Sequence, residues 1–99
     1  MNDVIELVTF SEYQDEKGEL IRTENLNQIF AERKSIKRVE FYQANANGFK
    51  PVFAFEINSF EYNDELFIKY NGKPYKVIRT YQTDIDKVEL VVEGAVNYG

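Results

Sequence analysis

The chain has 99 residues and a formal net charge of −5, and it contains eight Phe and seven Tyr but neither Cys nor His. This length predicts a single domain, residues 1–99, and the many bulky aromatic side chains favour β-strands. Without Cys or His the chain has no disulfides, no thiolate or imidazole metal ligands and no histidine base, so we expect neither an enzyme nor a bound cofactor.

The start of the chain carries no pattern for export or membrane insertion. Residues 1–10 lack the basic stretch and apolar core of a signal peptide, and no run of the sequence approaches the roughly 20 apolar residues of a membrane span. We therefore expect a soluble protein that is made in the cytoplasm and has no membrane partner.

The first third of the sequence predicts strands separated by a charged turn. Residues 3–13 alternate weakly between apolar and polar side chains, with both faces partly apolar, which is typical of a strand. Residues 15–18 read Asp-Glu-Lys-Gly and predict a turn. Residues 19–23 follow as either a short polar strand or a flexible charged loop. Residues 25–33 then resemble a strand that enters the core at residues 29–31.

One short helix is predicted, over about residues 35–46. Ser35 is a suitable N-cap. The apolar side chains that follow recur at a spacing of three, on one helical face: Ile36, Val39 and Tyr42. Gly48 is expected to end the helix in the left-handed region of backbone space.

Three antiparallel strands are predicted in the second half of the chain. Residues 49–58 are the most apolar of them. Asn71 and Gly72 lie between two alternating runs and predict a two-residue hairpin, because both tolerate the positive φ of a type I′ turn. Another turn is expected at residues 83–86. Apolar side chains share a face on the first and last of these strands: Phe53, Phe55 and Ile57, then Val88, Leu90 and Val92.

About six short strands at roughly ten-residue spacing predict a mainly β fold. The expected architecture is a small antiparallel β-barrel or sandwich with one short helix and protruding loops. A barrel would also pair the edges of the sheet.

No group of residues points to catalysis. The paired carboxylates at residues 15–16, 64–65 and 84–86 fall at predicted turns, where no apolar pocket is expected to raise their pKa values. The net negative charge opposes general binding to a phosphate backbone. A small barrel that stacks single-stranded nucleic acid on Tyr75 and Tyr81 is a second, less favoured interpretation.

A basic cluster around the start of the predicted helix is the candidate interface. Cations near a helix N-terminus oppose the helix dipole, so folding alone gives little reason to place them there. The cluster is either a solvated face or a contact patch for an acidic partner, including a second copy of this chain. Nearby aromatic side chains are interpreted as core, with a binding surface as the alternative. The full set is Arg33, Lys34, Lys37, Arg38, Phe41, Tyr42 and Phe49, together with the charged turn Asp15, Glu16 and Lys17.

The order of these features is that of a known family. The motifs are DEKGE (15–19), IFAE (29–32), EFYQA (40–44), FAFEI (53–57), YNGKPYKVI (70–78) and VELVV (88–92). From about residue 10 to residue 93, their order and character resemble the head–tail joining, or head-closure, proteins of tailed bacteriophages.

The resemblance implies a non-enzymatic structural protein of a virion or prophage, made in the cytoplasm of a bacterial host. Such a protein forms a homo-oligomeric ring, from subunits that can be monomeric when free. The ring docks below the portal and adaptor proteins after DNA packaging, and it offers a surface to the tail proteins. DNA passes through the ring without specific binding. A tail-completion or connector-adaptor role in the same neck is the alternative.

Overall fold

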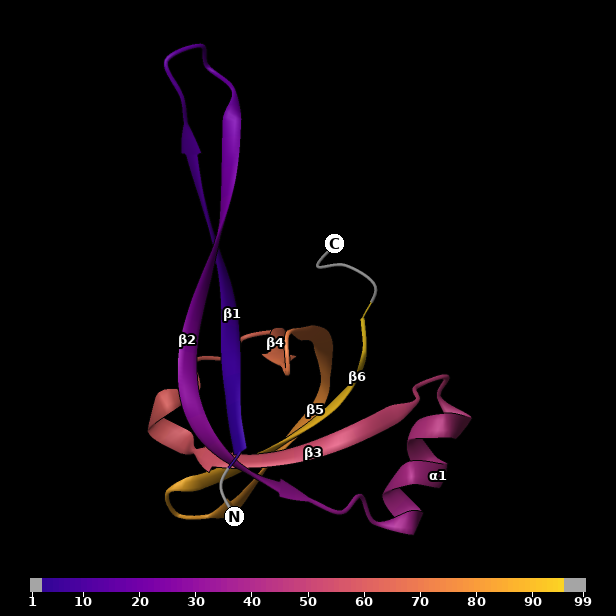
Figure 1. Cartoon of the computed structure of the whole chain (residues 1–99). Helices are drawn as coiled ribbons and strands as arrows, with labels where there is room; N and C mark the ends of the chain where they lie inside the picture. Colours follow the sequence, from indigo (N-terminus) through magenta and orange to yellow (C-terminus); the bar gives the residue numbers. More distant parts are fainter. Residues whose placement is uncertain (1–2, 96–99) are drawn as a thin grey trace.

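A computed structural model describes residues 3–95, and the strands in this part of the chain form a closed antiparallel barrel with the order β1-β2-β3-β6-β5-β4 (Figure 1). A long hairpin and a short helix protrude from it. The strands are β1 (Asp3–Gln14), β2 (Leu20–Lys34), β3 (Pro51–Asn58), β4 (Phe67–Tyr70), β5 (Lys73–Asp84) and β6 (Lys87–Gly94); the helix α1 is Arg38–Ala46, and a 3₁₀ turn, η1, is Ser59–Glu61. The prediction of a mainly β fold is confirmed. Of the two predicted architectures, a barrel and a sandwich, the structure is the barrel.

Alternating side chains from all six strands fill the barrel. The core cluster is Ile5, Leu7, Ile29, Ala31, Phe55, Ile57, Ile68, Tyr70, Val77, Leu90 and Val92. Phe55 is completely buried, and its ring centroid lies 4.9 Å from that of Tyr70 and 5.7 Å from that of Phe53. The predicted apolar faces of β3 and β6 are therefore the faces that form the core.

The predicted turns follow the backbone preferences of their residues. Asn71 and Gly72 have φ values of 52° and 76°, and Tyr70 pairs with Lys73 across them, which confirms the two-residue hairpin between β4 and β5. At residues 15–18 the Asp15 carboxylate accepts the backbone N–H groups of residues 17 and 19, at 2.9 and 2.8 Å. This turn joins β1 to β2.

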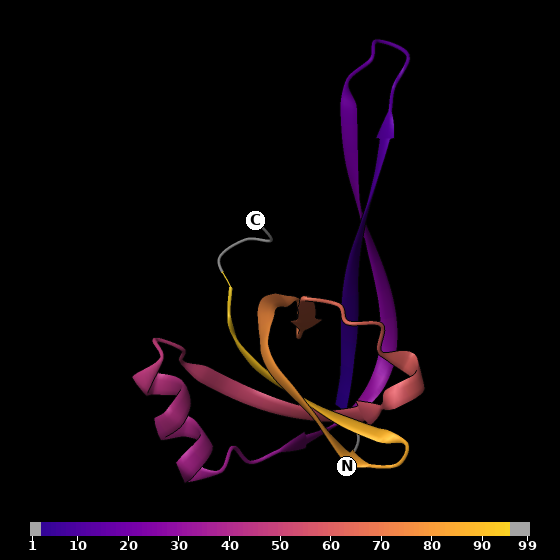
Figure 2. The same ribbon diagram turned by 180° about the vertical axis from the view of Figure 1, so that it is seen from behind.

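The β1–β2 hairpin is longer than the sequence predicts. Pairing runs from Asp3 opposite Ala31 to Gln14 opposite Leu20. The separate segments expected at 19–23 and 25–33 are one 15-residue strand because β1 supplies a partner along its length. Pairing of β1 with β4 covers residues 6–8, and pairing of β2 with β3 covers residues 32–34. Residues 9–26 extend beyond the barrel as a two-stranded ribbon, which we call the arm (Figures 1 and 2).

The helix begins later than predicted. Lys37, not Ser35, is the N-cap of α1, and it makes no capping side-chain hydrogen bond. The chain remains paired to β3 through Lys34, so residues 35–37 are needed to cross from the sheet to the helix. Within residues 3–95, no helix is long and apolar enough to cross a membrane.

The end of the helix agrees with the prediction. Gly48 has φ 85°. Its N–H donates to the carbonyl of Asn45 at 3.0 Å, and the N–H of Phe49 donates to that of Ala44 at 2.9 Å. These two bonds make a Schellman motif, which satisfies the last carbonyls of the helix.

Candidate functional site

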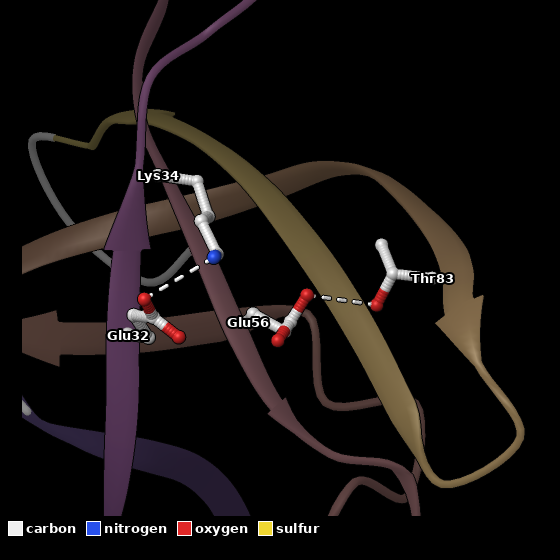
Figure 3. Close-up of polar contacts among 4 residues, drawn as sticks. All are labelled: Glu32, Lys34, Glu56 and Thr83. Atoms are coloured by element: carbon white, nitrogen blue, oxygen red, sulfur yellow. Dashed lines mark hydrogen bonds and ion pairs between the residues drawn. The ribbon is translucent and has the colours of Figure 1, made fainter.

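The structure separates the predicted basic cluster into three places. Arg33 lies on the same face of β2 as the buried Ile29 and Ala31. Its guanidinium carbon lies 5.6 Å from the ring centroid of Phe53. Lys34 points to the other face of the sheet, with Nζ 3.2 Å from Oε1 of Glu32 (Figure 3). Lys37 and Arg38 are exposed at the start of α1. Only this last pair is brought together on the helix.

Lys34 belongs to a polar cluster on the outside of the sheet (Figure 3). Glu32 and Glu56 are direct partners across β2 and β3, and Thr83 Oγ1 donates to Glu56 Oε2 at 3.0 Å. Like charges opposite each other on neighbouring strands repel. The hydrogen bond and the charge of Glu32 raise the pKa of Lys34, so the ammonium group offsets this repulsion. We therefore assign Lys34 a role in the fold rather than in a free contact patch.

A tyrosine and two glutamates connect α1 to the barrel. The Tyr81 hydroxyl contacts Oε2 of Glu40, in the first turn of α1, at 3.2 Å, and it also contacts Oε2 of Glu89 on β6. Burial raises the pKa of Glu89, and the charges of Glu40 and Glu56 raise it further. Tyr81 has one hydroxyl proton, so both contacts are hydrogen bonds only when one carboxyl is protonated. A protonated Glu89 that donates to Tyr81, which in turn donates to Glu40, satisfies both.

We expect Glu89→Gln to stabilise the protein at pH 7. A carboxyl with a raised pKa in the folded state contributes its full stability below the unfolded-state pKa of about 4.3, and that contribution is lost as pH rises through the higher folded-state value. Gln is uncharged at every pH, and its side-chain N–H can donate to the Tyr81 hydroxyl in place of the carboxyl proton. Urea unfolding should therefore show a stability gain over wild type that grows as the pH rises from about 4.3 through the folded-state pKa of Glu89.

Tyr81→Phe is the matched comparison. This variant should lose about 1 kcal/mol because it removes the hydroxyl that both carboxyl groups contact. A Glu89→Gln variant whose stability difference from wild type does not change with pH would contradict the assignment of the buried proton.

The helix is held by this polar contact and by limited apolar packing, since Ala44 of α1 and the buried Val91 of β6 line the same hollow. None of the residues of α1 is buried. Two hollows of about 250 and 200 Å³ lie between α1 and the barrel, and both are lined by Glu40, Gln43 and Arg79. Oε1 of Glu40 is buried without a hydrogen-bond partner in the described part of the chain. The helix is therefore a projecting element that rests loosely on the barrel.

The aromatic side chains next to the helix lie on the surface. Tyr42 is 62% exposed, and Phe41 and Phe49 are each 38% exposed. The prediction that they belong to the core is wrong, because the six strands close around their own side chains and leave no large apolar face for α1 to cover. Val39, one turn before Tyr42, is 68% exposed. The alternative, an exposed apolar surface on the helix, is the one observed.

The charged turn lies at the tip of the arm. Glu16 and Lys17 are exposed there, while Asp15 is engaged in the hydrogen bonds of the turn itself. The tip and α1 project from opposite ends of the molecule, whose longest extent is 52 Å (Figures 1 and 2). Within one molecule, the structure does not bring the two predicted interface segments together.

The sequence interpretation missed exposed apolar side chains along the hairpin. Tyr13, Leu20 and Leu26 are exposed on the arm, and nearer the barrel Val4 and Phe30 are exposed cross-strand partners. The signal for them is the weak alternation at residues 3–13, where both faces of the strand are partly apolar. One face of β1 and β2 fills the barrel; on the other, Val8 is buried whereas Val4 and Phe30 are exposed and available for contacts.

Neither metal-binding geometry nor comparison with known proteins assigns a chemistry to these surfaces. Across residues 3–95, no three or more His, Cys, Asp or Glu side chains are grouped so that they could hold a metal ion. No protein-family model matches the chain, and no curated protein sequence matches it. The surfaces must therefore be interpreted from their own charge, exposure and shape.

Proposed function

We propose that this protein is a structural component of the neck of a tailed bacteriophage or prophage, and that it joins head to tail as a ring on the portal and adaptor complex. The observation that carries the proposal is a closed barrel with two exposed projections, the arm and α1, at separate places on its surface. A subunit of a ring needs a body that keeps its shape and two different surfaces for its two neighbours. The barrel and its projections provide both.

The positions of the phage-like motifs support the same proposal. The DEKGE motif forms the tip of the arm, and EFYQA lies within α1. The YNGKPYKVI motif forms the β4–β5 turn and the start of β5. The motifs that carry the resemblance therefore fall on the projections as well as on the barrel.

Two tyrosines argue against the nucleic-acid-binding alternative. Tyr75 packs edge-on against Phe53, with ring centroids 5.4 Å apart, and the hydroxyl of Tyr81 is engaged by two carboxyl groups. Neither ring is an open platform for stacking a base. The net charge of −5 also favours a ring that lets DNA pass without gripping it.

Electron microscopy of purified protein mixed with DNA-filled, tailless capsids tests the proposal. The capsids carry portal and adaptor, and capsids without the adaptor serve as the control. We expect a ring of density below the adaptor in the first sample and bare portals in the second. Analytical ultracentrifugation of the protein alone gives the reference oligomeric state.

Other results would assign the protein a different role. Density on isolated tail tubes with bare capsids would indicate tail completion, and density directly on the portal without the adaptor would indicate a connector-adaptor role. If neither capsids nor tails bind the protein, the neck assignment is wrong. Salt-sensitive binding to single-stranded DNA, lost in Tyr75→Ala or Tyr81→Ala, would then support the nucleic-acid alternative.

A further inference from the structure

The net negative charge of the chain arises in its N-terminal hairpin. Residues 3–31 have a formal charge of −5, the same as the whole chain, and residues 32–99 contain ten acidic and ten basic side chains. The charged residues of the hairpin are Asp3, Glu6, Glu12, Asp15, Glu16, Glu19 and Glu24, against Lys17 and Arg22.

The opposite charge is concentrated around the helix. Residues 35–50, which we call the helix segment, have a formal charge of +2. They contain Lys37, Arg38 and Lys50, against Glu40. The two projections of the molecule therefore carry charges of opposite sign.

Each projection also exposes apolar side chains. The arm contacts β4 at its base, where Glu24 pairs with Lys69 and Phe10 packs against Phe67, and both projections extend from the barrel beyond such contacts. Tyr13 and Leu20 are exposed near the tip of the arm, and Val39 and Tyr42 are exposed on α1. An isolated two-stranded ribbon is marginally stable in water, and so is a helix of nine residues with no buried side chain. Both projections would gain stability from a partner.

The two projections cannot satisfy each other within one molecule. The arm rises away from the barrel on one side, and α1 lies at the other end of β3 from the arm, in both views (Figures 1 and 2). Complementary surfaces at separate places on one molecule produce head-to-tail contacts between copies.

We propose that the arm of one copy docks against the helix segment of the next. Glu16 and Glu19 of one copy lie beside Lys37 and Arg38 of its neighbour, and the exposed apolar residues of the arm tip cover those of α1. Such a contact leaves one arm and one helix unpaired at the ends of any open chain, so a closed ring is the assembly that satisfies every copy. The inference rests on the proposed neck function only for where the ring assembles.

Disulfide cross-linking tests the contact directly, because the chain has no Cys and each introduced thiol is unique. Lys17→Cys places a thiol at the arm tip, and Ser35→Cys places one before α1; both keep the acidic and basic residues of the proposed contact. We expect the mixed, oxidised variants to form a heterodimer. Lys73→Cys, at the exposed start of β5, removes the same kind of side chain as Lys17→Cys and replaces it as the control partner of Ser35→Cys.

Charge reversal gives a second, independent readout. Lys37→Glu/Arg38→Glu in the Ser35→Cys copy should reduce the heterodimer yield by about tenfold or more, because like charges then face each other. Glu16→Lys/Glu19→Lys in the Lys17→Cys copy should have the same effect. Combining the two reversed copies should restore the yield toward that of the original pair.

The outcomes separate this contact from the neck function. A heterodimer yield no higher than that of the Lys73→Cys control, or cross-links only between two arm tips, would overturn the contact. A ring on capsids without arm-to-helix cross-links would leave the neck function standing and overturn this inference. Specific cross-links in a protein that binds neither capsids nor tails would support the contact and overturn the neck function.

Discussion

Lys37→Glu/Arg38→Glu is expected to leave the barrel folded and to abolish assembly on capsids. Both side chains are exposed at the start of α1 and away from the barrel interior. Reversing them removes two cations that oppose the helix dipole, but it also removes the attraction between Lys37 and Glu89, so the isolated subunit should stay folded with only a small change in stability. In an assembly, opposing like charges destabilise a contact by several kcal/mol, which corresponds to about a hundredfold or more in affinity.

The measurement is the amount of protein bound per DNA-filled, tailless capsid, with urea unfolding of the free subunit as the stability control. Lys73→Glu/Lys76→Glu is the matched variant, because it makes the same change of charge at exposed positions of β5. We expect it to assemble normally. If the helix variant binds capsids and supports infectious particles as well as this control does, the helix segment is not the assembly surface.

Arg33 and Lys34 are left out of this variant for structural reasons. Lys34→Glu would place a third carboxylate beside Glu32 and Glu56, and its effect on folding would obscure an effect on assembly. Arg33 lies over the Phe53 ring, so replacing it also removes a packing contact at the barrel. The basic cluster that is continuous in the sequence therefore has one part suited to a partner and another that serves the fold.

The features that the sequence predicts well are those determined by a few neighbouring residues. Asn71 and Gly72 define their turn through their own backbone preferences, and Gly48 ends the helix for the same reason. The alternation at residues 88–92 identifies the core face of β6, because period-two patterning is a local property of a strand. The mainly β class follows from the sum of such signals.

The features that the sequence does not predict depend on pairing between distant segments. Nothing local to residues 19–33 shows that β1 will hold them as one strand, or that pairing with β3 will delay the helix beyond Ser35. Glu65 is another example: its carboxylate accepts the N–H of Asn63 at 2.6 Å and is only 6% exposed, although its sequence context is that of an exposed turn.

The candidate site also combines features that neighbouring residues determine with features that depend on pairing between distant segments. The basic residues and the charged turn are visible in the sequence as clusters, and the turn and two of the basic residues, Lys37 and Arg38, lie on projections. Their separation by the length of the molecule, the exposure of Phe41, Tyr42 and Phe49, and the role of Tyr81 in holding α1 are consequences of barrel closure. Because closure holds the two projections apart, their opposite charges can attract each other between copies but not within one molecule.

Phe55→Ala is expected to destabilise the barrel by about 3–5 kcal/mol, through lost apolar burial and the cavity left behind. Phe55 is completely buried, and its ring contacts those of Phe53 and Tyr70. Since domains of this size are stable by roughly 5–15 kcal/mol, the variant should lose a large share of its stability. The midpoint of urea unfolding measures the loss.

Phe60→Ala is the matched control for this loss. The Phe60 side chain is 76% exposed, so its removal should change the stability by no more than about 0.5 kcal/mol. A similar small effect of Phe55→Ala would contradict the assigned core. The two kinds of variant also separate fold from function: Phe55→Ala should reduce assembly only as far as it unfolds the barrel that carries both projections, whereas Lys37→Glu/Arg38→Glu should lose assembly with the barrel intact.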